Sequence, residues 1–104
     1  MLDESLPRKL RYDFGDEHEV KTARDMGWLG KKNGELLRLM MENNFELFIT
    51  VDRNLPYQRN LQKLTVTIFV LRAKDNTRDT LRLLIPKMFA RLSKGDLQNV
   101  IEIA

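Results

Sequence analysis

The segment from Leu64 to Leu71, LTVTIFVL, constrains the fold of this chain more than any other. It is rich in β-branched residues and apolar on both faces, so a strand built from it is expected to be buried on both sides. Such strands occur in parallel sheets that carry helices on each face. The sequence therefore predicts an α/β fold with this segment near the centre of its sheet.

The rest of the chain alternates between helical and extended patterns. This order predicts a mainly parallel sheet of four to five strands, covered on both faces by helices, in a single domain over residues 1–104. The predicted helices are one ending near Gly15, one with Asn33 as its N-cap, a short one over 57–61, and one that starts after an Asp75–Thr77 cap, is interrupted at Pro86 and stops near Gly95; the predicted strands are 45–51, 64–71, 99–103 and, more weakly, 18–23.

Composition narrows the chemistry. The chain of 104 residues has no cysteine and one histidine, His18, which argues against disulfides, thiol catalysis, a His-rich metal site and a Ser-His-Asp triad. Its net charge of +3 is compatible with a polyanionic partner. No apolar run has the roughly 20 residues that a membrane helix needs, and we expect a cytoplasmic protein with no membrane partner.

Acidic residues follow the predicted strands. Asp52 comes directly after the 45–51 strand, and Asp3 follows the apolar start Met1-Leu2. Glu35 lies in the first turn of the helix that begins at Asn33. Because parallel strands end at one edge and a returning helix begins there, these carboxylates are expected at the same edge of the sheet. Oxygen ligands of this kind suit Mg²⁺ or Mn²⁺.

Each acidic residue also has an ordinary structural explanation. Glu35 alone is more often a residue that interacts favourably with the helix dipole. Asp52 begins Asp-Arg-Asn, which is common turn chemistry, and Asp3 is a plausible helix cap. Because all three are expected at one edge of the sheet, a metal site explains them about as well as these separate structural roles do.

Three motifs in order resemble a family of small PIN-like proteins, long described as domains of unknown function and related to VapC-type toxin ribonucleases. The motifs are LDESLP at the start, GWLGKKNGELL in the middle and TVDRNLPYQ after the 45–51 strand. The resemblance covers nearly the whole chain and implies a PIN-like three-layer α/β/α sandwich. It also implies a metal-dependent nuclease in which Asp3, Glu35 and Asp52 are the catalytic, Mg²⁺- or Mn²⁺-binding residues.

Two features depart from the family pattern. Many relatives carry an aspartate near the position of Asn33, so the acidic set here is one carboxylate short. Relatives also have more apolar residues before the LDES motif, where this chain has only Met1 and Leu2. Other polar residues are expected to assist: Glu4, Asn33, Thr50 and Asn54 in supporting the site, and Arg53, Arg72, Lys31 and Lys32 in binding RNA phosphates.

The leading functional hypothesis is a Mg²⁺- or Mn²⁺-dependent endoribonuclease, the toxin of a toxin–antitoxin pair. The family implies a small DNA-binding antitoxin as partner, and a homodimer is a further expectation. The alternative is a catalytically silent PIN-like binding module, which Asn33 and the modest charge favour. A phosphoacceptor receiver domain is set aside, because it needs a hydroxyl residue after the fourth strand, where this chain has Arg72-Ala73.

Overall fold

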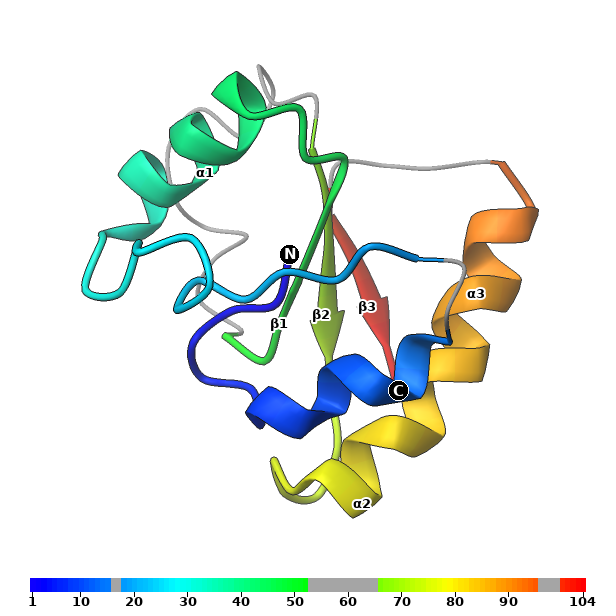
Figure 1. Cartoon of the computed structure of the whole chain (residues 1–104). Helices are drawn as coiled ribbons and strands as arrows, with labels where there is room; N and C mark the ends of the chain where they lie inside the picture. Colours follow the sequence, from blue (N-terminus) through cyan, green and yellow to red (C-terminus); the bar gives the residue numbers. More distant parts are fainter. Residues whose placement is uncertain (16–17, 53–65, 96–99) are drawn as a thin grey trace.

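The computed structural model describes residues 1–15, 18–52, 66–95 and 100–104 (Figure 1). Their fold is mixed α/β, as the sequence predicts, with a parallel sheet of three strands in the order β1-β2-β3. The strands are β1 (Leu47–Thr50), β2 (Thr67–Leu71) and β3 (Val100–Ile103). The central strand β2 lies within the 64–71 segment, so the prediction from its two apolar faces is confirmed.

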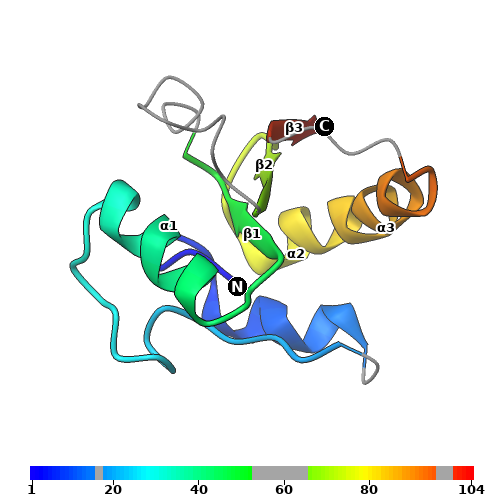
Figure 2. The ribbon, with the colours of Figure 1, turned by 90° about the horizontal axis from the view of Figure 1, so that it is seen from above.

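Helices cover both faces of the sheet. They are the α-helices α1 (Asn33–Glu42), α2 (Arg78–Leu81) and α3 (Ile85–Ser93), and the 3₁₀-helices η1 (Arg8–Phe14) and η4 (Arg82–Leu84). Figure 2 shows α1 on one side of the strands and α3 on the other.

Two hydrophobic cores follow from the alternation of side chains along β2. Ile68 and Val70 point to a core that α1 completes with Leu36, Leu37 and Met40. Phe69 and Leu71 point to the opposite core, which contains Leu10 and Phe14 of η1 and Ile85 and Met88 of α3. A helix–sheet–helix sandwich results, with β2 buried on both faces.

The expectation of four to five strands is wrong for the described residues, which form three. Leu2 lies parallel to β1 but pairs only as isolated bridges, with Ile49 on one side and Thr22 on the other. The pairing stops because the chain turns immediately after Asp3, where the Leu6 N–H donates to the Asp3 carbonyl at 3.1 Å. The weak strand signal over 18–23 is reduced to the bridge at Thr22.

The helix boundaries agree with the sequence at some positions and differ at others. Asn33 is the first residue of α1 and Lys32 is its N-cap, so the prediction of an Asn33 cap is wrong by one residue. The predicted Thr77 cap is confirmed, because its hydroxyl accepts a hydrogen bond from the Thr80 N–H. Pro86 restarts the helix in the first turn of α3, where a missing N–H costs nothing. The predictions for residues 57–61 and Asn99 lie outside the described residues.

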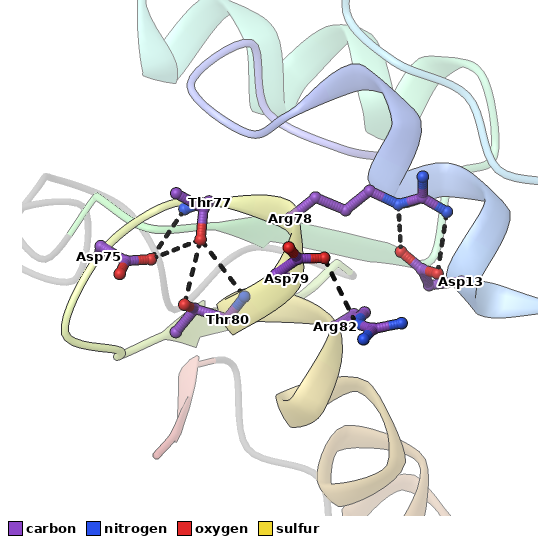
Figure 3. Close-up of polar contacts among 7 residues, drawn as sticks. All are labelled: Asp13, Asp75, Thr77, Arg78, Asp79, Thr80 and Arg82. Atoms are coloured by element: carbon purple, nitrogen blue, oxygen red, sulfur yellow. Dashed lines mark hydrogen bonds and ion pairs between the residues drawn. The ribbon is translucent and has the colours of Figure 1, made fainter.

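Polar contacts fix α2 against its neighbours (Figure 3). Asp13 of η1 receives two hydrogen bonds from the Arg78 guanidinium, at 2.9 and 3.2 Å. This bidentate pair raises the pKa of Arg78 and joins η1 to the start of α2. None of the described helices is long and apolar enough to cross a membrane.

Candidate functional site

Asp3 lies beside the carboxyl end of β1. Its N–H donates to the Ile49 carbonyl at 2.9 Å, and the Ile49 N–H donates to the Met1 carbonyl at the same distance. These bonds extend the sheet by one short parallel segment and place Asp3 next to Thr50, the last residue of β1. Ligand sites of open parallel sheets lie at this edge.

The Asp3 carboxylate is held by three hydrogen bonds. Oδ2 accepts from the Thr50 hydroxyl at 2.7 Å and from the Ser5 hydroxyl at 2.8 Å. Oδ1 accepts from the Glu4 N–H at 2.9 Å. A carboxylate offers about four acceptor positions, so these contacts leave Oδ1 with capacity for a further ligand.

Thr50 connects Asp3 to Asp52. Its side chain is fully buried, and its hydroxyl oxygen accepts a hydrogen bond from the Asp52 N–H at 3.0 Å while donating to Asp3. One hydroxyl therefore fixes the positions of two acidic residues that are far apart in sequence. Asp52 is half-buried at this edge.

Glu35 lies in the first turn of α1, as the sequence predicts. Figure 1 shows α1 running roughly antiparallel to β1. The Glu35 carboxylate is 3.4 Å from the Lys31 ammonium, one helical turn away, and is about 40% exposed. Within the described ranges, no group of three or more His, Cys, Asp or Glu side chains is arranged to hold a metal ion.

The expected supporting residues have different positions. The Glu4 carboxylate accepts a hydrogen bond from the Gly30 N–H at 3.3 Å, which ties the loop before α1 to the Asp3 segment. Asn33 begins α1, and Thr50 makes the contacts described above. Asn54 lies outside the described residues.

The basic residues expected to bind RNA are partly paired. Arg72, just beyond β2, forms an ion pair with Glu102 of β3 at 3.0 Å. Lys31 pairs with Glu35, and Lys32 is exposed at the start of α1. Arg53 lies outside the described residues. Arg72 directly follows the carboxyl end of β2, and Lys31 and Lys32 directly precede α1.

The donor chemistry of this edge fits a hard divalent cation. Mg²⁺ usually binds through one or two carboxylates and keeps several of its waters. Asp3 and Asp52, joined through Thr50, supply two carboxylate-bearing residues, and Oδ1 of Asp3 has a free acceptor position. A site that uses these two residues is thus compatible with the geometry, whereas the described contact of Glu35 is with Lys31.

Sequence reasoning missed the part that Ser5 plays. It was not among the predicted site residues, yet its hydroxyl donates to the Asp3 carboxylate, while Pro7 is the N-cap of η1. The Asp-x-Ser spacing is the signal for this local contact, since a short hydroxyl side chain easily reaches a carboxylate two residues earlier.

Comparisons with known proteins found no relative of this chain: no family model matches, and neither does any curated protein or solved structure. The functional assignment therefore rests on the geometry of the site and on the sequence motifs.

Proposed function

We propose that this protein is a metal-dependent ribonuclease of the PIN-like type, with its site at the carboxyl edge of the sheet. The observation that carries the proposal is the Asp3–Thr50–Asp52 arrangement. A fully buried threonine hydroxyl donates to the Asp3 carboxylate and accepts from the Asp52 N–H, at the edge where parallel sheets bind their ligands. The motifs LDESLP and TVDRNLPYQ, which contribute these residues, support the same assignment.

The roles of the residues follow from their contacts. Asp3 and Asp52 would hold the cation, and the hydroxyls of Thr50 and Ser5 would keep the Asp3 carboxylate in one orientation. A bound Mg²⁺ or Mn²⁺ would supply Lewis-acid activation of water and of the phosphate. Lys32, Lys31 and Arg72 would neutralise phosphates of a single-stranded RNA and position it along the edge.

The test is metal-dependent cleavage of an RNA pool. Asp3→Asn and Asp52→Asn preserve shape but remove the ligand charge, and each is expected to abolish cleavage in Mn²⁺. Glu42→Gln is the matched control, because it removes one exposed carboxylate at the opposite end of α1 and should cleave like the parent protein. Activity that survives in both aspartate variants would contradict the proposed site.

Asn33→Asp is a sharper probe of the same site. If the missing carboxylate limits metal affinity, this variant should reach half-maximal cleavage at a lower Mn²⁺ concentration than the parent. An unchanged metal requirement would show that position 33 does not contribute a ligand.

The second candidate is a PIN-like binding module without nuclease activity. It is favoured by the Lys31–Glu35 pair and by the lack, in the described part of the chain, of a third ligand close to the other two. RNA that is bound in a salt-dependent way but is never cut, with or without Asn33→Asp, would support this candidate over the nuclease.

The partner proposals rest on the family resemblance. A PIN-like toxin would be neutralised by a small DNA-binding antitoxin, and a homodimer is the expected assembly. A short neighbouring gene that encodes a helix-turn-helix protein would support the toxin role, and co-purification of the two products would test it directly.

A further inference from the structure

A cavity of about 430 Å³ lies at the amino end of β1, away from the Asp3–Thr50–Asp52 edge. Leu47, at the start of β1, lines it together with the extended segment 18–21 and the side chains of Met88 and Phe89 from α3. Its volume is in the range of small-molecule sites, and its lining is more apolar than polar. A second cavity shares His18, Glu46 and Leu47 with it, so the hollow continues along this end of the sheet.

Aromatic rings form one wall of the cavity. The His18 ring stacks on Phe89 with centroids 4.8 Å apart and an interplanar angle of 21°. Phe14 meets the same Phe89 ring edge-to-face, at 6.0 Å and 82°. Because His18 is exposed and Phe89 is half-buried, this wall continues from the interior to the solvent. Flat rings of this kind favour a flat ligand that stacks or presents its edge.

The rim of the cavity carries a negative charge at one residue, Glu46. Glu19 and Lys21 line the cavity and are 3.7 Å apart, so they largely compensate each other. Glu46 is exposed, lines both cavities and has no ion pair or hydrogen bond to another described side chain. A cationic ligand therefore complements this rim.

We propose that the cavity binds a small planar aromatic cation, with its ring against the His18–Phe89 wall and its positive group at Glu46. The proposal does not depend on the nuclease assignment. The ligand would lie at the end of β1 opposite Asp3 and Thr50, so both sites can be occupied at once.

Benzamidine is a suitable probe, since it combines one aromatic ring with one cation. Its titration into the full chain, followed by ¹H–¹⁵N NMR, should give saturable shifts centred on His18, Glu46, Leu47 and Phe89. Glu46→Gln should weaken benzamidine binding roughly threefold, the size expected of an exposed ion pair. The neutral isostere benzamide should bind both proteins equally, and benzoate should bind most weakly.

Two further variants distinguish binding at this cavity from nonspecific binding elsewhere on the protein. Glu42→Gln removes an equally exposed carboxylate outside the cavity and should leave benzamidine affinity unchanged. His18→Ala changes an exposed side chain and should weaken the binding of both benzamidine and benzamide, because it removes the exposed ring of the aromatic wall. Shifts that do not saturate, benzoate binding as tight as that of benzamidine, or an unchanged affinity in Glu46→Gln would overturn the proposal.

Discussion

Thr50 is the residue on which the candidate site depends most directly. Its hydroxyl donates to Asp3 and accepts from the Asp52 N–H, in a position without solvent access. Removing that hydroxyl deletes both the donor to the Asp3 carboxylate and the acceptor of the Asp52 N–H. The stability lost with this hydroxyl is therefore expected to be larger than that lost with an average surface hydrogen bond.

Thr50→Val should consequently destabilise the protein by about 1–3 kcal/mol in urea unfolding, the usual cost of an unsatisfied buried group. Thr50→Ser retains the hydroxyl and should lose much less. Thr67→Val is the matched control on β2, because the hydroxyl of this half-buried threonine makes no hydrogen bond to another described residue, and it should be nearly neutral. Equal effects at positions 50 and 67 would contradict a special role for Thr50.

The amino group of Met1 predicts a pH dependence of stability. It donates to the Leu47 carbonyl at 3.0 Å, and burial lowers its pKa from 8.0 to about 6. Between these values the unfolded chain binds a proton that the folded protein does not, so the free energy of unfolding rises with pH. Below pH 6 the amine is charged in both states, and the folded protein alone bears the cost of burying that charge, on the order of 3 kcal/mol.

Urea unfolding of the 104-residue chain between pH 5.5 and 8.5 measures this rise. Acetylation of the α-amine should flatten the profile over that range. His18→Gln removes the imidazole and should retain the rise. A profile that His18→Gln flattens and acetylation does not would assign the effect to the histidine.

At the scale of elements, the start of α2 depends on a small polar network (Figure 3). The Thr77 hydroxyl accepts from the Thr80 N–H and donates to the Asp75 carboxylate at 2.7 Å. The same hydrogen bond lowers the pKa of Asp75. A four-residue helix has few internal bonds, so its cap decides whether it forms.

Thr77→Ala is expected to cost about 1 kcal/mol of stability, the usual effect of losing an N-cap, while Thr77→Ser should retain most of it. The loss should also loosen the Arg78–Asp13 pair, because Arg78 is the first residue of α2. Faster amide exchange at the Asp13 end of η1 in Thr77→Ala, and not in Thr77→Ser, would show this coupling. Unchanged exchange there would mean that η1 is held by its apolar contacts alone.

At the scale of the whole molecule, the candidate metal site predicts stabilisation by a ligand. A cation that binds only the folded state stabilises it by about 1.4 kcal/mol once its free concentration is roughly ten times its dissociation constant. Thermal melts should therefore shift upward in Mn²⁺, and Asp52→Asn should lose most of that shift. Glu42→Gln should retain it. A parent protein whose melting temperature is the same in Mn²⁺ and in EDTA would argue against the site.

The residue pattern of single segments predicted individual strands and helices better than it predicted how many strands the sheet contains. LTVTIFVL indicated a strand buried on both faces because every second side chain reaches a different core, and β2 has that environment. The number of strands was overestimated because Leu2 and Thr22 pair only as isolated bridges, and the chain turns directly after Asp3, where the Leu6 N–H donates to the Asp3 carbonyl. Sheet topology predicted Asp3 at the edge where β1 ends, whereas its bond to Thr50, the Lys31–Glu35 pair and the role of Ser5 depend on side-chain geometry that spacing does not specify.

The bond between Asp3 and Thr50 joins residues that are 47 positions apart, and this separation sets the order in which the site is assembled. During synthesis Asp3 leaves the ribosome well before Thr50, and its carboxylate then has only its nearest neighbours, Glu4 and Ser5, to hold it. The position beside Asp52 exists only after β1 has been made and has paired with the first residues of the chain. A nascent chain that ends before β1 therefore carries the LDES motif without the site, and whatever chemistry this edge performs begins only when the sheet has closed around it.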